Sequence, residues 1–220
     1  MGVQERKARE FQRREGEILS AALSLFKRDD WELVTVEEIA RQAEIGKGTI
    51  YKHFESKDEI YARLALEFNR QLLRQIEQVD ATLPVIARFR EMTRLAWNAH
   101  LSSKELHRVA LYCGRSEFRH SLPPAIAEEF TAVELATHAV SSAILAQGVE
   151  EGIFPQKPVA TLLFGAQSAF WGAVQLVWSG YLGEVDQVHH GEEITNFMLA
   201  GLIYQDHHIA ADGSQRKPST

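Results

Sequence analysis

The chain has 220 residues, of which 45% are hydrophobic and 25% charged, so it can form one large globular domain or two smaller ones. Cys113 is the one cysteine, which excludes an internal disulfide and the usual four-ligand zinc site, and a reducing cytoplasm is the expected compartment. The formal net charge is −6, with 11 Lys and Arg against 13 Asp and Glu in residues 1–60, so any basic surface must be local.

The apolar pattern predicts helices throughout, because no stretch shows sustained alternation with β-branched residues and hairpin turns. The first helix has one apolar face at helical spacing, made of Ile18, Ala21, Ala22, Leu25 and Phe26. Asp29 and Asp30 end it. The N-terminal residues hold no apolar run of signal-peptide length, so no secretion signal is expected.

Two short helices are predicted next. Thr35 with Glu38 fits a capping box, in which a hydroxyl and a carboxylate satisfy the first backbone N–H groups of a helix. A turn around Glu44 leads to a third segment, Lys47–Phe54, which buries Ile50 and Phe54. Ser56 with Glu59 then offers a second capping box at the start of a long helix.

The rest of the chain reads as a larger helical body. The predicted helices are Lys57–Val79, Pro84–Ser102, Lys104–Phe118, Pro123–Glu151, Pro158–Leu182 and Gly191–His208. The fold class is therefore all-α, with about nine helices. We expect a helix-turn-helix head at 1–60, a ligand-binding and dimerisation body at 61–208, and a disordered tail at 209–220.

The segment TVEEIARQAEIGKGTIYKHFESKDEI, residues 35–60, predicts the function. Two short helices joined by a three-residue turn form a helix-turn-helix, whose second helix can enter the major groove of DNA. Ile50 and Phe54, four residues apart, face inward. The residues predicted to contact DNA are Thr35, Lys47, Gly48, Thr49, Tyr51, Lys52, His53 and Lys57.

Each of these residues has a predicted role in binding DNA. Gly48 allows close backbone approach, while Lys47 and Thr49 reach base edges or phosphates. Tyr51, Lys52 and His53 supply phosphate donors, and Thr35 and Lys57 lie at helix N-termini that favour phosphate. The alternatives are a helical hairpin that merely packs, a Tyr51 that is half-buried packing, and a His53 that is ordinary surface.

Residues 14–64 resemble the TetR family of bacterial regulators. The resemblance is carried by EILSAALSLF in the first helix, TVEEIA in the second, GKGTIYKHF in the recognition segment and SKDEI at the fourth. It implies a homodimeric all-α repressor whose body binds a small ligand, with the Lys57 helix relaying that event to the heads. Two positions depart from the family: Glu44 stands where glycine is common and would have to tolerate positive φ, and Gly46 stands where a small hydroxyl residue is common.

The stretch Pro158–Gly183 contains no charged residue and meets the length criterion for a transmembrane span. A helix buried against the body and a second subunit is favoured instead. The span contains the polar residues Gln167, Ser168 and Gln175, and no cluster of basic residues flanks it. The resemblance likewise implies a homodimer through the last two helices, with no membrane.

Aromatic residues in the body suggest an apolar pocket. The candidate ligand-binding residues are Trp97, Tyr112, Phe130 and Trp171, chosen from different helices so that they could converge. For each residue, plain core packing is the alternative. The effector is expected to be small and apolar or aromatic, and its identity cannot be read from the sequence.

No catalytic residue, metal site or cofactor is predicted, so the chain is expected not to be an enzyme. Cys113 reads as a small buried hydrophobe, and Ser168 lacks the flanking glycines of a nucleophile elbow. None of the histidines forms an HExxH pair.

The sequence therefore predicts a cytoplasmic, ligand-responsive transcriptional repressor that binds a palindromic operator as a dimer. Its predicted partners are double-stranded operator DNA, a small-molecule effector and a second copy of the chain. Two alternatives remain: a helical small-molecule-binding or catalytic protein with a non-functional head, and a membrane-associated protein anchored by residues 158–182.

Overall fold

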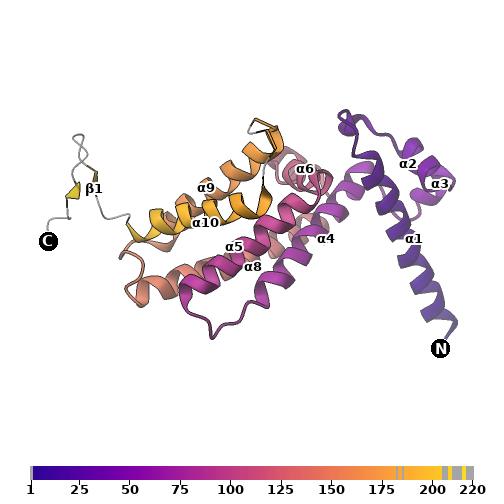
Figure 1. Ribbon diagram of the computed structural model, residues 1–220. Coiled ribbons are helices and arrows are strands. Elements are labelled where there is room, and N and C mark those ends of the chain that lie inside the picture. The colour runs from indigo at the N-terminus through magenta and orange to yellow at the C-terminus, as the bar shows by residue number, and fades with distance from the viewer. Residues whose placement is uncertain (1, 182, 185, 205–207, 210–214, 217–220) are drawn as a thin grey trace. The chain divides into compact units, whose positions relative to one another are not determined.

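The computed structural model describes residues 2–181, 183–184, 186–204, 208–209 and 215–216, and ten α-helices make up most of this described part (Figure 1). They are α1 (Val3–Leu25), α2 (Val36–Gln42), α3 (Lys47–Ile50), α4 (Lys57–Glu77), α5 (Val85–Ser102), α6 (Lys104–Cys113), α7 (Ser116–Ser121), α8 (Pro124–Glu150), α9 (Val159–Ser179) and α10 (Gln187–Ile203). A short 3-10 helix spans Trp31–Leu33, and two antiparallel two-residue strands, β1 (His208–Ile209) and β2 (Gln215–Arg216), lie near the C-terminus. The all-α prediction is confirmed.

The chain forms two compact units. Unit 1 contains residues up to 71 together with 103–133, and unit 2 contains 72–102 together with the residues from 134 onward. Helices α4 and α8 each contribute to both units. The predicted domains, a DNA-binding head at 1–60 and a ligand-binding body at 61–208, are defined by function, and this division stays a prediction. Most of the predicted disordered tail, 209–220, lies outside the described residues.

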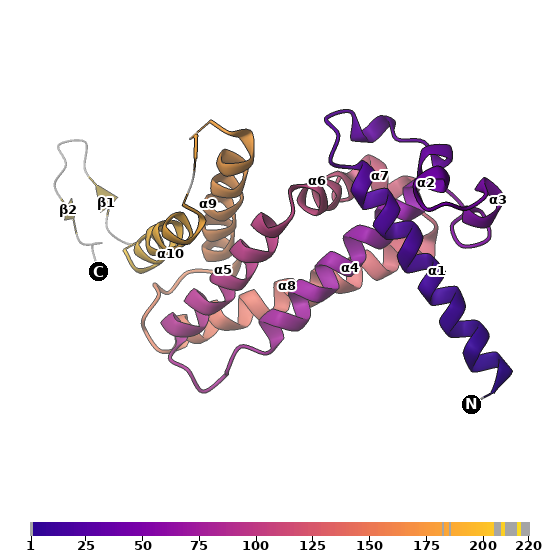
Figure 2. The ribbon, with the colours of Figure 1, turned by 45° about the vertical axis from the view of Figure 1, so that its right-hand side comes forward.

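The first three helices in unit 1 enclose a small apolar core. Ile18 and Ala22 on α1, and Phe26 directly after it, are fully buried. Ile39 is fully buried on α2, which packs against α1. Ile18, Ala22 and Phe26 form the i, i+4, i+8 face expected of an amphipathic helix, and its burial stabilises the head by apolar transfer from water. Figure 2 shows α2 and α3 on one side of α1.

An aromatic cluster joins the head to the other part of unit 1. Trp31 packs edge-on against Tyr61 of α4 and Tyr112 of α6, with ring centroids 5.7 and 5.5 Å apart. Phe26 meets Tyr61 at 4.8 Å, and the Tyr61 hydroxyl donates to the Trp31 carbonyl at 3.3 Å. Edge-to-face geometry is the favoured arrangement for such rings and holds these segments in fixed orientation.

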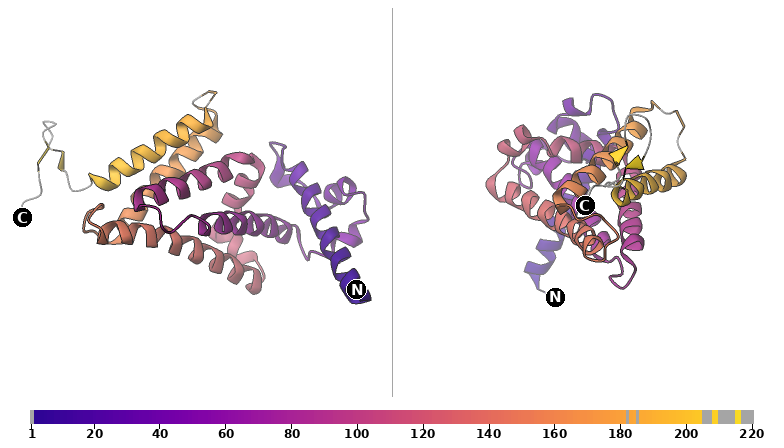
Figure 3. Two further views of the ribbon diagram at one scale, coloured as in Figure 1. Left: turned by 60° about the horizontal axis from the view of Figure 1, so that its bottom comes forward. Right: turned by 90° about the vertical axis from the view of Figure 1, so that its left-hand side faces the viewer.

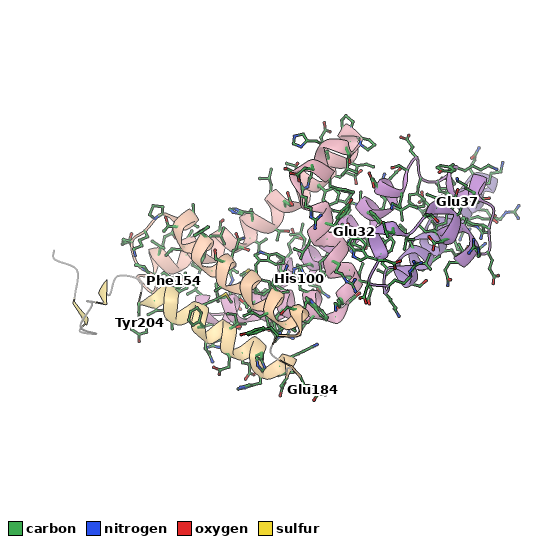
Figure 4. The ribbon with its side chains drawn as sticks, turned by 90° about the horizontal axis from the view of Figure 1, so that it is seen from above. Glu32, Glu37, His100, Phe154, Glu184 and Tyr204 are labelled. Carbon is green, nitrogen blue, oxygen red and sulfur yellow. The ribbon has the colours of Figure 1, made fainter. Side chains whose placement is uncertain are left out.

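In unit 2, α9 and α10 run side by side and α5 packs against both, as the two views of Figure 3 show. Their shared core includes Phe89 from α5, Leu162 from α9 and Leu199 from α10, together with Phe154. The Phe154 ring, labelled in Figure 4, sits where a Cβ on Gly148 of α8 would lie, so this glycine permits a close approach.

Three predicted boundaries are wrong. The single helix predicted over Lys104–Phe118 is two helices, because Arg115 adopts an extended backbone with φ −68° and ψ 139° that begins α7. Helix α9 ends at Ser179, where Gly180 takes the left-handed conformation with φ +70°. Helix α10 begins four residues before the predicted Gly191, because the Asp186 carboxylate accepts hydrogen bonds from the amides of the first turn.

Among the described residues, α9 is the one helix long and apolar enough to cross a membrane by length and composition. Only 22% of its most apolar window is buried in this chain. Leu162, Leu163, Ala166 and Val174 form its buried side. Phe164, 75% exposed, lies on the side that this chain leaves open.

Candidate nucleic-acid interface and ligand cavity

Helix α2 begins with the predicted capping box. The Glu38 amide donates to Thr35 Oγ1 at 3.2 Å, and the Thr35 amide donates to Glu38 Oε2 at 2.8 Å. The Thr35 amide, followed by the Arg28 guanidinium, lowers the pKa of Glu38 to about 2. The prediction is confirmed, and the Thr35 hydroxyl is already engaged with the Glu38 carboxylate at 2.9 Å.

The turn between α2 and α3 depends on Glu44. This residue has φ +54°, so the positive φ expected there is confirmed. The turn closes where the Ile45 amide donates to the Ala40 carbonyl at 3.0 Å. Gly46 then caps α3 without a side-chain hydrogen bond, as its missing hydroxyl predicts.

Helix α3 has one buried side and one exposed side. Ile50 and Phe54 are 1% and 3% exposed and anchor the segment from behind, as predicted. Lys47, Gly48 and Tyr51 are exposed, and so is Lys52 in the turn that follows. Thr49 is half-buried. The regular helix ends at Ile50, four residues before the predicted end at Phe54, so its exposed polar surface is short.

Lys47 makes an ion pair with Glu37, which Figure 4 labels on α2. The hydrogen bond from Lys47 lowers the pKa of Glu37, and the same bond raises the pKa of Lys47. Both side chains are about half exposed, which makes the pair weak and exchangeable. The Lys47 ammonium also lies 5.7 Å from the centroid of the Tyr51 ring.

His53 and Lys57 are held by contacts within unit 1. The His53 ring lies 4.0 Å from the Phe11 ring of α1 between centroids, and its side chain is only 7% exposed. Lys57 Nζ donates to the Glu32 carbonyl at 2.8 Å and lies 5.4 Å from the Tyr61 ring centroid. Both residues are therefore already engaged in contacts within unit 1.

Unit 2 contains a cavity of about 130 Å³ between α4, α5, α8, α9 and α10. Eleven of its sixteen lining residues are apolar, with Phe89, Phe170 and Trp171 as its aromatic walls. The polar lining residues are Thr93, His100, Thr137, Ser141 and Gln167, and none of the sixteen is Asp, Glu, Lys or Arg. The cavity is therefore suited to an uncharged molecule.

Two buried polar residues on α5 face this cavity. Thr93 is 4% exposed, and it lines the cavity. His100, labelled in Figure 4, is 5% exposed and lies 4.7 Å from Trp171 between ring centroids. These two residues give the apolar wall polar groups to which a ligand can form hydrogen bonds.

The four aromatic residues predicted to bind ligand do not converge. Trp171 lines the cavity. Trp97 is core, because its indole packs on Gly191 and its Nε1 donates to the Gln187 carbonyl at 2.7 Å. Tyr112 belongs to the unit 1 aromatic cluster, and the buried Phe130 ring in unit 1 carries the Arg119 guanidinium 4.8 Å from its centroid.

Cys113 is fully buried, and burial raises the pKa of its thiol well above the ordinary range. This agrees with its interpretation as a small hydrophobe. Within the part of the chain that the structure describes, no three His, Cys, Asp or Glu side chains group as metal ligands would.

Comparison with known proteins gives a consistent result. Residues 18–64 match the family model described as bacterial regulatory proteins, tetR family. YfiR of Bacillus subtilis, an uncharacterized HTH-type transcriptional regulator, is 35% identical over 52 residues, or 24% of this chain and 25% of its own length. HbdR of Aromatoleum sp., an HTH-type transcriptional regulator, is 29% identical over 129 residues, or 51% and 56% of the two chains.

The matched segments thus span between a quarter and about half of the curated relatives. The fold similarity extends further. The TetR-family transcriptional regulator PfmR of Thermus thermophilus superposes with a TM-score of 0.71 at 22% identity, covering 84% of this chain and 98% of PfmR. The helix-turn-helix segment of this chain thus matches the family model of bacterial tetR-type regulatory proteins, and the all-α fold of the described residues resembles that of PfmR.

Proposed function

We propose that this protein is a cytoplasmic, DNA-binding transcriptional repressor that reads a palindromic operator as a homodimer and is released by a small effector. The observation that carries the proposal is the exposed polar side of α3, held from behind by Ile50 and Phe54. A short helix anchored in this way can enter the major groove without disturbing the head. Two heads would occupy half-sites about 34–36 Å apart.

The contacts divide by accessibility. Lys47, Gly48, Tyr51 and Lys52 would make the direct contacts, with Gly48 permitting close approach of the backbone. Lys47 would exchange Glu37 for a phosphate or base edge. Thr49, which is half-buried and has a short side chain, would contact a base edge or phosphate only where the duplex approaches α3 closely.

The three remaining predicted contacts lie at the margin of this surface. Thr35 and Lys57 lie at helix N-termini, where backbone N–H groups favour phosphate. His53, covered by Phe11, would act mainly by fixing the end of the recognition segment.

Dimerisation through α9 and α10 is supported by their exposed apolar side chains. Phe164 on α9 and Phe197 on α10 are 75% and 67% exposed, and Val188 and Tyr204 extend the apolar surface. A monomer seldom exposes such a surface, and a self-complementary patch is what a two-fold dimer requires. Solubility without detergent would separate this proposal from a membrane anchor.

The effector would be a neutral molecule of about one aromatic ring with one hydrogen-bonding group. An engineered apolar cavity of similar volume, about 150 Å³, accommodates benzene. The uncharged lining disfavours carboxylates and phosphates, because no cation would replace their lost hydration. Thr93 would hold the single polar group.

Coupling between effector and operator requires an element that both sites can bias. Helix α4 begins with Lys57 in the head, and its Leu72 and Ile76 line the cavity. Weakening the operator complex a hundredfold needs about 2.7 kcal/mol of differential binding, which is ordinary for coupled sites. We propose that α4 relays the effector to the heads.

Selection of bound duplexes from a random DNA pool tests DNA reading. Enrichment of a two-fold symmetric site supports the proposed repressor function. If no sequence is enriched at moderate salt, the alternative of a helical protein with a non-functional head is favoured. The matched control is the variant Lys47→Ala with Lys52→Ala, which keeps the buried anchors but should lose enrichment.

Titration with small aromatic probes tests the cavity. Phenol and benzyl alcohol should release the enriched operator, whereas benzoate at equal concentration should not. Thr93→Val, nearly equal in volume, should weaken release by phenol by about tenfold, the loss expected of one buried hydrogen bond. Equal release by benzoate and phenol would refute the neutral-ligand assignment.

A further inference from the structure

The first half of α1 projects beyond the head of unit 1. Residues 4–13 are all exposed, whereas from Ile18 onward α1 has one buried face. Figures 1 and 2 show this end of α1 without another helix of the head beside it. The family match begins at residue 18, so the segment 3–14, here called the arm, lies outside it.

The arm carries the positive charge that the head lacks. It contains five basic residues against two acidic ones. Residues 18–60 contain six basic residues against nine acidic ones. Since affinity for duplex DNA rises with the number of phosphates that cations neutralise, the arm is the best-charged part of this region for phosphate contact.

The arm also starts at the right place. Phe11 packs on His53, three residues beyond the end of α3, and Glu15 Oε1 lies 4.0 Å from His53 Nδ1. The arm therefore leaves the head beside the end of the recognition segment. From Phe11 to Val3 the helix rises about 12 Å, a length along which B-DNA presents about seven phosphate charges.

Two arm cations have no competing carboxylate. Arg13 and Arg14 each pair with Glu17 at 2.7 Å. Arg6 and Lys7, in contrast, form no ion pair with any described residue, and Glu5 is occupied in accepting a hydrogen bond from the Gly2 amide at 3.0 Å. Their charged ends can reach phosphates without breaking an existing contact.

We propose that the arm binds the phosphates of duplex DNA flanking the half-site that α3 reads. The contact adds affinity that does not depend on sequence, and it extends the footprint beyond the recognition helix. This inference rests on the proposed function, because it presupposes that α3 engages an operator.

The test compares Arg6→Ala with Lys7→Ala, as a double variant, against Gln4→Ala with Gln12→Ala as the matched control on the same exposed helix. Loss of two phosphate contacts should lower the slope of log K against log salt by about two and weaken binding by about tenfold or more at 0.1 M salt. The preferred sequence should not change. The control should bind like the wild type.

A second duplex locates the contact. When the base pairs outside the inverted repeat are trimmed, the wild type should lose its advantage over the double variant. Unchanged slope and affinity in the double variant, or an advantage undiminished on the trimmed duplex, would overturn the inference. Arg6→Gln with Lys7→Gln removes the same charge but keeps long polar side chains, and it should give the same result. A wild type that binds no sequence refutes the proposed function instead.

Discussion

Replacing Gly48 by alanine is expected to change folding and DNA binding in opposite directions. Gly48 is the second residue of α3, has no positive φ, and has open space where a Cβ would lie. Alanine therefore fits the free protein without moving a neighbour. In the complex, the same methyl group would lie where the backbone must approach the duplex.

The two effects differ in sign and size. In a helix, alanine is more favourable than glycine by about 0.5–1 kcal/mol, so Gly48→Ala should raise the free energy of unfolding by up to that amount. In a closely packed interface, one added methyl costs about 1–3 kcal/mol, which is about 5-fold to 150-fold in Kd. Chemical denaturation measures the first effect and fluorescence anisotropy with the enriched operator measures the second.

Gly16→Ala is the matched control. Gly16 lies on α1, is exposed, and also has open space at its Cβ position. It should gain similar stability and keep wild-type affinity for DNA. If Gly48→Ala becomes more stable and binds the operator as tightly as the wild type, the exposed side of α3 does not approach DNA closely, and the assignment of the interface is wrong.

Three further outcomes are expected. Lys52→Ala should weaken binding about equally on all sequences and lower the salt slope by about one if Lys52 touches only phosphate, whereas a new sequence preference would place it on a base. Phe197→Glu should give a monomer in light scattering and lose two-fold operator binding, while Leu135→Glu, equally exposed on α8, should stay dimeric. Burial lowers the pKa of His107 to about 4. Below about pH 6.5 the unfolded chain therefore binds a proton at His107 that the folded chain does not bind. The free energy of unfolding should fall by at most about 3 kcal/mol between pH 6.5 and 4, and this fall should be smaller in His107→Leu.

The head could be predicted because its signals are local. A capping box depends on two residues three apart, and Thr35 with Glu38 forms it as the sequence indicates. The positive φ of Glu44 follows from the resemblance to the TetR family, in which glycine is common at this position of the turn. Ile50 and Phe54, four residues apart, had to share one side of a helix, and both are buried.

The cavity could not be predicted, because it depends on how helices distant in sequence fill space. Periodicity identifies the apolar side of α5 but does not show which of its residues meet a partner. Trp97 packs against Gly191, ninety-four residues later, whereas Thr93 one turn earlier is left facing an opening. Gly114, with Ser116 two residues later, could have indicated the break between α6 and α7. The helical periodicity of apolar residues continues across this break, so periodicity alone predicts a single helix.

The acidic head is compatible with selective DNA reading. Non-specific affinity depends mainly on charge, so nine acidic against six basic residues in 18–60 weaken it. Selectivity is the ratio of specific to non-specific affinity, and it rises when the second falls more than the first. The ion pair between Glu37 and Lys47 fits this principle if, as proposed, Lys47 exchanges Glu37 for a phosphate or base edge. Lys47 would then add affinity only where the duplex fits α3, and shape and position, rather than total charge, would be the basis of recognition.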